Sequence, residues 1–331
     1  MLNLSVKTDR DKLEQMIADD VEQYCKEIYE ADNRAHLGAS VLGEQCWRKL
    51  YYQFRWFKKP DPDGRVRRIF NVGHEAEPRF IKYLRGIGFE VKPFAQELWY
   101  SSELNDYKIL EWDADKSGGT GSYLPVDSLF HISEAKKRGL DLKQWRISGA
   151  KGHYGGSLDA ELKAPERYML DTALVLSGEF KTNNTGSGFA KVRSEDLSKS
   201  KPKHYAQMCQ YGVKRGYKYG LYMIENKNDS DITFRIVELD WNYGKSLEMK
   251  AEEIIFATEP PPRIAENPSY FDCKYCDDFQ GICHRGDKPD KNCRTCRHSK
   301  PIENAAWYCT RFEGEIPNEF VKTGCDEWNA I

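Results

Sequence analysis

The chain has 331 residues, enough for one large domain or two domains with a substantial core. Its 50 Lys and Arg residues face 52 Asp and Glu residues, and the net charge of -2 excludes a protein that attracts nucleic acid through overall positive charge. No run approaches 18 consecutive apolar residues and the N-terminus lacks a signal-peptide profile, so we expect a soluble, cytoplasmic protein without a membrane partner.

The first half of the chain predicts helices and then irregular sheet structure. Helical spacing of apolar residues predicts helices at residues 8–31, 40–56 and 67–84. A short strand is expected to follow at 89–92. Residues 95–154 carry turn signals, including those at 117–121, and short alternating runs, which indicate sheet edges or an insertion.

The second half predicts an alternation of strands and helices. The expected elements are strands at 155–163 and 173–182, a helix at 202–215, a hairpin of 219–225 with 232–239, and a helix at 243–257. Residues 182–201 are rich in Gly, Ser, Asn and Lys and predict a mobile loop. Three successive prolines at 260–262 mark a boundary, so we divide the chain into regions 1–262 and 263–331.

Two expected strands carry a notable charge pattern. Asp159 ends the sequence Gly-Gly-Ser-Leu-Asp, and Glu179 and Lys181 flank Phe180 in Gly-Glu-Phe-Lys-Thr. Side chains alternate along a strand, so Glu179 and Lys181 face the same side, and Asp159 joins them if the strands pair. Two carboxylates suit Mg²⁺ or Mn²⁺, and an adjacent amine suits activation of water for phosphodiester attack. The same residues also fit a solvated ion pair, but charge that ends an apolar strand is costly unless it is paired or binds a metal.

Seven of the ten cysteines lie in the last 60 residues. They are Cys273, Cys276, Cys283, Cys293, Cys296, Cys309 and Cys325. In a cytoplasmic protein, C-x2-C units indicate metal ligands, with disulfides or idle thiols as the alternative. The last four permit a tetrahedral structural Zn²⁺ site. Two others, Cys25 and Cys209, are expected to be structural.

Two basic runs are candidates for DNA contact. They are Arg65, Arg67 and Arg68, and Lys199, Lys201, Lys203 and His204. Either run equally fits an ordinary solvated surface.

The order of these motifs resembles the PD-(D/E)xK nuclease superfamily, and within it the RecB-like and lambda-exonuclease-like phage enzymes. Gln207 and Tyr211 match its Q-x3-Y motif and lie on one helical face. The segment from Gly73 matches its first motif, which makes Glu77 the expected metal ligand and His74 the alternative. The resemblance implies an α/β fold, with a mixed central sheet flanked by helices as in restriction endonucleases and a small cysteine-rich, metal-binding C-terminal region.

A second resemblance concerns the cysteines. The segment Gln-Cys-Trp-Arg-Lys-Leu-Tyr-Tyr around Cys46 is similar to the start of iron-sulfur nucleases, which hold a 4Fe-4S cluster with one N-terminal and three C-terminal cysteines. The set implied here is Cys46, Cys273, Cys276 and Cys283. Cys46 fits a small buried apolar residue as well.

The resemblances imply a metal-dependent DNA exonuclease of recombination, repair or replication, located in the host cytoplasm if phage-encoded, with partner proteins from those processes. The implied metal ligands are Asp159, Glu179, Glu77 and the Phe180 carbonyl. Lys181 would orient the attacking water, and Gln207 and Tyr211 would hold phosphate oxygens or position Lys181. The alternatives are a metal-stabilised DNA-binding or adaptor protein without activity and, from the cysteines, a redox protein.

Overall fold

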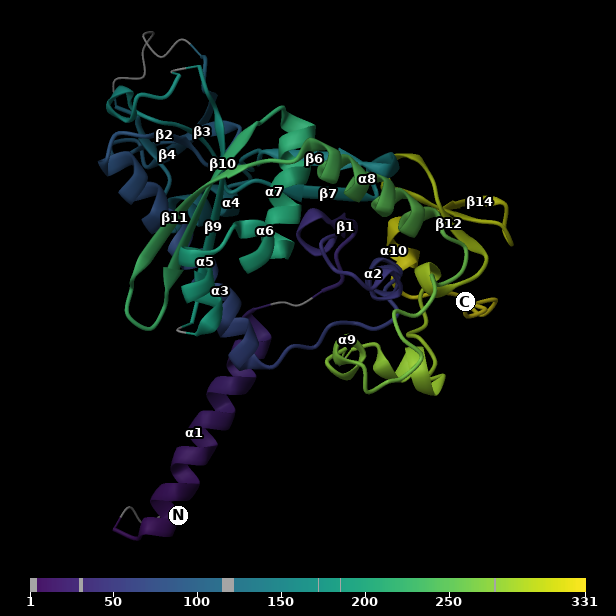
Figure 1. Ribbon diagram of the computed structural model, residues 1–331. Coiled ribbons are helices and arrows are strands. Elements are labelled where there is room, and N and C mark those ends of the chain that lie inside the picture. Colours follow the sequence, from purple (N-terminus) through teal and green to yellow (C-terminus); the bar gives the residue numbers. More distant parts are fainter. Residues whose placement is uncertain (1–4, 30–31, 115–121, 172, 185, 277) are drawn as a thin grey trace.

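The computed structural model describes residues 5–29, 32–114, 122–171, 173–184, 186–276 and 278–331. It is a mixed α/β structure built on a five-stranded sheet of order β11-β10-β9-β8-β2 (Figure 1). The strands are β2 Glu90–Lys92, β8 Ala160–Lys163, β9 Leu176–Asn183, β10 Tyr219–Asn226 and β11 Ile232–Glu238. Only β9 and β10 run parallel; the other neighbours are antiparallel. The predicted mixed central sheet flanked by helices is confirmed.

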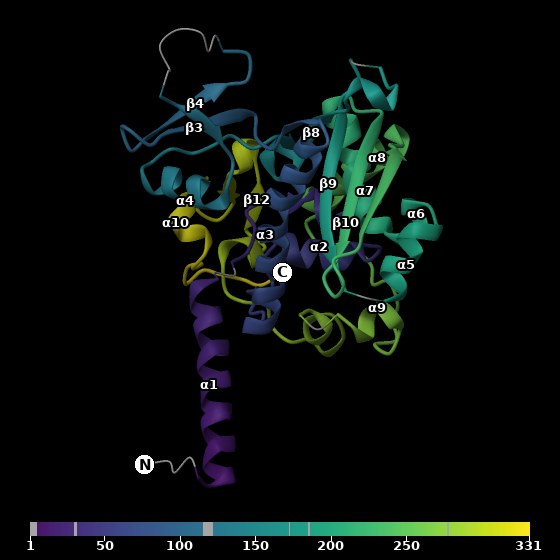
Figure 2. The ribbon, with the colours of Figure 1, turned by 90° about the vertical axis from the view of Figure 1, so that its left-hand side faces the viewer.

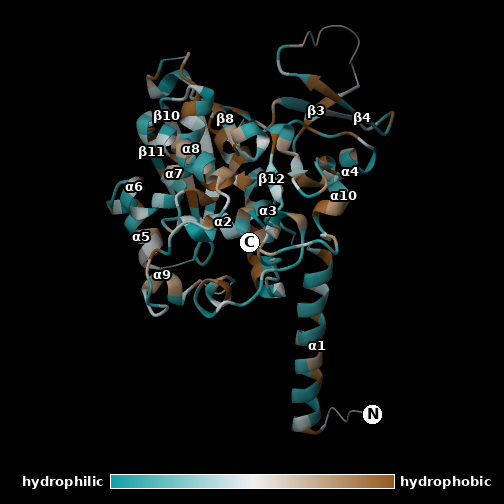
Figure 3. Ribbon diagram, turned by 90° about the vertical axis from the view of Figure 1, so that its right-hand side faces the viewer, coloured by the Kyte–Doolittle hydropathy of each residue, from teal (hydrophilic) through white to brown (hydrophobic). Residues whose placement is uncertain are grey.

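Helices cover both faces of this sheet. Helix α3 (Gly64–Gly86) and helix α7 (Pro202–Arg215) lie on opposite sides of β9 and β10 (Figure 2). On the α3 side, Phe180 of β9 meets Phe80 with ring centroids 5.9 Å apart. The alternate residues of β9 therefore face α7, in agreement with the two-residue period of a strand. Figure 3 shows hydrophobic residues gathered in the sheet and its covering helices.

The expected strand at 155–163 is wrong in one respect, because it is two strands. Strand β7 (Tyr154–Ser157) pairs with β1 (Leu37–Gly38) and β6 (Arg146–Gly149) in a separate sheet. Strand β8 then begins at Ala160 in the central sheet, and its register places Ala160 opposite Gly178. Leu158 and Asp159 lie between the two strands, so Asp159 sits at the junction of the sheets.

Two other expectations are corrected near helix α7. The helix predicted from residue 40 begins only at Trp47, as α2 (Trp47–Phe54), after a short 3-10 turn. Gly43 lies in the turn before this helix, and a β-carbon there would lie 2.8 Å from Cα of Lys203, so the turn packs closely on α7. The loop predicted at 182–201 contains helices α5 (Ser187–Ser194) and α6 (Leu197–Ser200).

The remaining elements surround this core. Strands β3 (Gln96–Ser101), β4 (Asp106–Glu111) and β5 (Leu124–Val126) form a small sheet with helix α4 (Leu129–Lys137), as the insertion alternative expects. The turn signals at 117–121 lie outside the described residues. Helix α1 (Lys7–Ile28) projects from the body, is mainly hydrophilic and buries only Cys25; residues 30–31 of the predicted helix are not described. Helix α8 is Trp241–Phe256.

The cysteine-rich region packs against the N-terminal segment. It contains α9 (Phe271–Lys274), β12 (Ser299–Pro301), β13 (Trp307–Cys309), β14 (Gly314–Ile316) and α10 (Asn318–Val321). Trp307 is 1% exposed and belongs to the main hydrophobic core. The buried guanidinium of Arg55 donates hydrogen bonds to the carbonyls of Arg294 and Ser299, each at 3.1 Å. The guanidinium of Arg294 donates in return to the Phe54 carbonyl at 2.8 Å.

Candidate functional site

The site lies where the pairing between strands β8 and β9 ends. Beyond Gly178 the backbone of β9 has no β8 residue beside it, and the Phe180 N–H instead donates to Asp159 Oδ2 at 2.6 Å. The Asp159 carboxylate thus takes the place of a strand carbonyl and is fixed against the sheet. A charge-assisted hydrogen bond of this length is a strong one.

Glu179 and Lys181 lie on the face of β9 that points toward α7. The Lys181 ammonium forms an ion pair with Glu179 Oε1 and lies 3.7 Å from Asp159 Oδ2. It also donates to the Phe180 carbonyl at 3.1 Å. The Glu179 side chain is 1% exposed, whereas those of Asp159 and Lys181 are 17% and 27% exposed. The three predicted side chains therefore converge, and the site opens to solvent beside Asp159 and Lys181.

The predicted Gln207 and Tyr211 connect this site to helix α7. Gln207 Nε2 donates to Glu179 Oε2 at 3.2 Å and to the Tyr211 hydroxyl at 3.0 Å. The Tyr211 hydroxyl donates to the Ser157 carbonyl at 2.8 Å. Gly156 makes room for this contact, because a β-carbon there would lie 3.1 Å from the hydroxyl. The hydrogen bonds run from the end of β7 through α7 to the buried Glu179.

Burial and neighbouring charges set the protonation of the group. Burial, together with the charge of Asp159, raises the pKa of Glu77 on α3 to about 8, although Lys181 opposes the rise. Burial alone would lower the pKa of Lys181, but the carboxylates of Glu179 and Asp159 outweigh it and raise this pKa, so the amine stays protonated. Glu77 thus belongs to the acidic group. His74 is exposed, and no described contact joins it to the three acids.

The donor set fits a hard divalent cation. Asp159, Glu179, Glu77 and the Phe180 carbonyl offer only oxygen atoms, which Mg²⁺ and Mn²⁺ prefer. As they stand, the described residues include no group of three or more His, Cys, Asp or Glu side chains spaced to hold one metal ion. Mg²⁺ commonly takes one or two carboxylates and keeps several waters, which suits a pair of acids bridged by Lys181.

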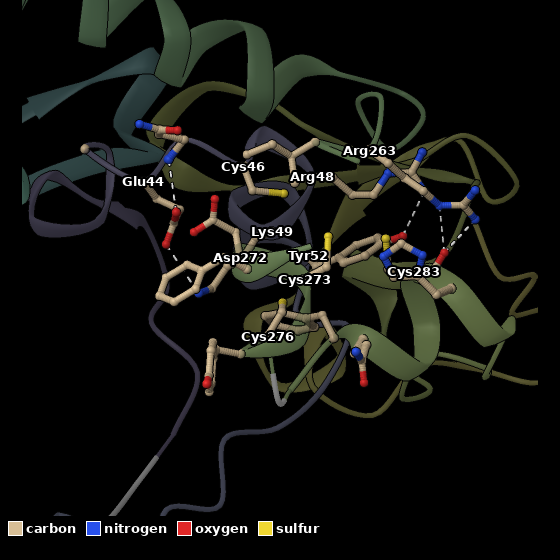
Figure 4. Close-up of a pocket in the computed structure, with 18 of the residues that line it drawn as sticks. Glu44, Cys46, Arg48, Lys49, Tyr52, Arg263, Asp272, Cys273, Cys276 and Cys283 are labelled. Atoms are coloured by element: carbon tan, nitrogen blue, oxygen red, sulfur yellow. Dashed lines mark hydrogen bonds and ion pairs between the residues drawn. The ribbon is translucent and has the colours of Figure 1, made fainter. Parts of the chain in front are cut away.

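The first predicted cysteine set surrounds a single cavity. Cys46, Cys273, Cys276 and Cys283 all line a cavity of about 410 Å³, and Figure 4 shows the four side chains around it. The cations Arg48, Lys49 and Arg263 line the same cavity. Burial raises the pKa of the Cys273 and Cys276 thiols, and the charge of Lys49 opposes the rise at Cys276. Arg263 Nε donates to the Cys283 carbonyl at 2.9 Å, which fixes the third cysteine segment.

The second predicted set surrounds a much smaller space. Cys293, Cys296, Cys309 and Cys325 line a cavity of about 20 Å³, room for about one water-sized sphere. Burial raises the pKa of the Cys293 thiol to about 11, and the three other thiols add to the rise. Trp328 lines the cavity too.

Some contributors are not among the predicted site residues. The Ser157 carbonyl receives the Tyr211 hydroxyl, and a backbone group carries no sequence signal of its own. Arg48 and Lys49, by contrast, lie two and three residues after Cys46 and could have been identified from the same segment. The basic run at 65–68 is largely accounted for by structural contacts: Arg67 donates to the Pro62 carbonyl at 2.9 Å, and Arg68 pairs with Glu22 at 3.1 Å.

Comparison of the sequence with protein-family models and with curated proteins gives no match. Among solved structures, the chain is similar to LHK-Exo in complex with dAMP, at 13% identity over 69% of this chain and 90% of the other, with a TM-score of 0.37. It is similar to SSO0001 at 12% identity over 81% of this chain and 96% of the other chain, with a TM-score of 0.38. It is also similar to the alkaline exonuclease LHK-Exo from Laribacter hongkongensis, at 14% identity over 67% of this chain and 87% of the other chain, with a TM-score of 0.36. Likenesses of this size do not establish a family.

In the described part of the chain, no helix combines the length and apolar character needed to cross a bilayer.

Proposed function

We propose that the chain is a Mg²⁺- or Mn²⁺-dependent nuclease that hydrolyses phosphodiester bonds in DNA. The observation that carries this proposal is the meeting of Asp159, Glu179 and Lys181 at the free edge of β9. Asp159, Glu179, Glu77 and the Phe180 carbonyl would hold the ion. When bound, the ion supplies Lewis-acid stabilisation of the charge that develops on the phosphate oxygens.

The residues of the chain have separate tasks in this proposal. Lys181 keeps its proton, orients the attacking water by donating to it and offsets the charge of the carboxylates. Gln207 holds Glu179 through its amide, so this carboxylate cannot turn away. Tyr211 fixes Gln207 and acts as a positioning residue. His74 has no task here, since Glu77 supplies the acid on α3.

The finer proposal is a DNA exonuclease that acts in recombination, repair or replication. It rests on the order of motifs in the sequence, which resembles that of RecB-like and lambda-exonuclease-like enzymes. The proposed location, the cytoplasm or the host cytoplasm for a phage-encoded enzyme, rests on the same resemblance.

The two cysteine sets are proposed to hold different metals. A cavity of about 410 Å³ suits a 4Fe-4S cluster at Cys46, Cys273, Cys276 and Cys283. A cavity of about 20 Å³ suits a single structural Zn²⁺ at Cys293, Cys296, Cys309 and Cys325. Both would brace the C-terminal region against the core, and neither takes part in hydrolysis.

Digestion of end-labelled DNA tests the activity. Wild-type protein is incubated with 5′- or 3′-labelled single- and double-stranded DNA and with Mg²⁺, Mn²⁺ or EDTA. Cleavage is expected only with a metal ion, and the label that is released first gives the polarity. Glu179→Ala should abolish cleavage, and Glu238→Ala, an exposed Glu on β11, should not. DNA binding without cleavage under every condition would favour the non-catalytic adaptor instead.

A further inference from the structure

We propose that Lys201, Asn183 and His204 form a second anion-binding subsite, which takes a backbone phosphate of the bound strand next to the scissile one. This inference rests on the proposed nuclease function. It assigns a role to two members of the second basic run, Lys201 and His204, and to one polar neighbour, Asn183, none of which the hydrolytic site uses.

The lysines of that run have different surroundings. Lys199 is exposed on α6. Lys203 forms an ion pair with Glu44 at 2.8 Å and is occupied in packing α7 against the N-terminal segment. Lys201 is half-buried, and among the described residues no carboxylate lies within ion-pairing distance of its ammonium. Burial lowers the pKa of Lys201 without an acidic neighbour to offset it. A partly desolvated cation without a counter-charge favours an anion from outside the chain.

Asn183 converges on the same place. A β-carbon at Gly188 would lie 3.2 Å from Lys201 Nζ and 3.4 Å from Asn183 Nδ2, so both donors approach the start of α5. Asn183 Oδ1 already accepts the Asn184 N–H at 3.0 Å, which leaves the amide nitrogen as the free end. Asn183 also lies two residues after Lys181 on β9 and therefore on the α7 side of the sheet.

His204 links this place to the hydrolytic site. It lies one turn before Gln207 on α7, and its Nδ1 is 2.8 Å from the Tyr222 hydroxyl. Tyr222 is the register partner of Glu179 in the neighbouring strand. Burial, together with the charges of Lys181 and Lys201, lowers the pKa of His204 to about 3, so the ring is neutral. With the hydroxyl donating to Nδ1, Nε2 carries the proton and is a donor.

The result is a series of donors beside the carboxylates. The hydrogen-bond donors are Lys181, His204, Lys201 and the Asn183 amide nitrogen. The oxygen ligands for a metal ion are those of Asp159, Glu179 and Glu77. A nucleic-acid strand with one phosphate at the acids would present the next to these donors. Contacts to a phosphate position the strand without reading its sequence, so we expect no base preference from this subsite.

Binding of DNA to variants in a Glu179→Ala background tests the subsite without cleavage. Lys201→Met should weaken binding of a single-stranded oligonucleotide about 10-fold, the loss of one charged hydrogen bond. The slope of log Kd against log salt should fall by about 0.7, the value for one phosphate contact on a single strand. Lys199→Met makes the same charge change two residues away on an exposed side chain. It should alter neither the binding affinity nor the slope of log Kd against log salt. Lys201→Arg should keep most of the affinity.

The position of the phosphate is tested with oligonucleotides that carry one neutral methylphosphonate linkage each, with and without a terminal phosphate. Neutralising one internal linkage next to the scissile one should weaken DNA binding by the Glu179→Ala protein about 10-fold. In the same background, the affinity of Lys201→Met should fall less than about 2-fold. Equal losses in the parent and in Lys201→Met at every linkage, or an effect confined to the terminal phosphate, would overturn the subsite. Asn183→Ala repeats the test if Lys201→Met does not fold. Failure of the wild type to cleave DNA refutes the nuclease itself, whereas normal cleavage with an unaltered Lys201→Met refutes only this inference.

Discussion

The proposed hydrolytic site and the cysteine cavities are organised in opposite ways. In the proposed hydrolytic site three groups already have a partner within the chain: Asp159 has the Phe180 N–H, Glu179 has Lys181 and Gln207, and Tyr211 has the Ser157 carbonyl. Each cysteine set instead surrounds a cavity with side chains from separate segments. The fold alone therefore positions the first site, whereas in the proposal a metal would join the segments of each cysteine set.

The largest effect is expected when the cation of the hydrolytic site is removed. Lys181→Met deletes the charge that offsets Glu179 and Asp159 and orients the water, so cleavage should fall by about 10³-fold or more. Single-turnover digestion of labelled DNA measures the rate, and circular dichroism measures the fold. Lys82→Met on the exposed face of α3 is the matched control. A Lys181→Met protein of wild-type activity would contradict the proposed mechanism.

The cysteine cavities should respond in stability and metal content. Cys276→Ala should remove iron and its visible absorption but keep zinc, and Cys325→Ala should remove zinc but keep iron. Loss of a structural metal should lower the free energy of unfolding by about 4 kcal/mol or more. Cys209→Ala, a buried thiol on α7 outside both cavities, should keep both metals. Metal analysis of anaerobically purified protein is the measurement. Loss of the same metal in both variants would show that the two sets are divided wrongly.

The sequence predicted those parts of the molecule whose signals are local. Helix α7 matches its predicted range of 202–215 because Pro202 opens it and Gly216, with φ at 78°, closes it. The two-residue period of β9 placed Glu179 with Lys181, and the four-residue spacing on α7 placed Gln207 with Tyr211. These local spacings depend only on the period of a strand or a helix and not on contacts with distant segments.

Features that depend on contacts between distant segments could not be predicted in the same way. The break at Leu158 and Asp159 exists because β7 and β8 join different sheets. Lys201 and Lys203 look alike in the sequence, and only the approach of Glu44 from the N-terminal segment distinguishes them by forming an ion pair with Lys203. The partition of the cysteines into two sets followed from the resemblance and stays a prediction, and the difference between the two cavity volumes had no signal in the sequence.

A smaller effect is expected from pH at the docking of the cysteine-rich region. His153 is fully buried, and its Nε2 donates to the carbonyls of Ile302 at 2.9 Å and Ala306 at 3.1 Å. Burial lowers the pKa of His153 to about 4, against about 6.5 in an unfolded chain. Between these two pH values, His153 is therefore neutral in the folded state and protonated in the unfolded state. Stability from this group is complete above pH 6.5 and is lost as the pH falls toward 4, by about 3 kcal/mol in all.

Urea unfolding at pH 7 and pH 4.5 measures this loss. His153→Gln should have a lower stability at pH 7 and a smaller further decrease on acidification than the wild type. His74→Gln, which changes an exposed ring, should follow the wild-type pH dependence. Identical pH dependence in His153→Gln and the wild type would show that another group causes the acid sensitivity.

The smallest expected effect concerns how firmly the fold holds Glu179. Tyr211→Phe removes the hydroxyl that accepts from Gln207 and donates to the Ser157 carbonyl, while the ring still fills its place beside Gly156. Loss of these hydrogen bonds should cost about 1–2 kcal/mol of stability. Because Gln207 then holds Glu179 less firmly, kcat should fall about 10-fold with little change in KM. Tyr219→Phe on β10 is the control. An unchanged kcat in a destabilised Tyr211→Phe protein would limit Tyr211 to packing, and the preorganisation of the hydrolytic site would then rest on Lys181 and the Phe180 N–H alone.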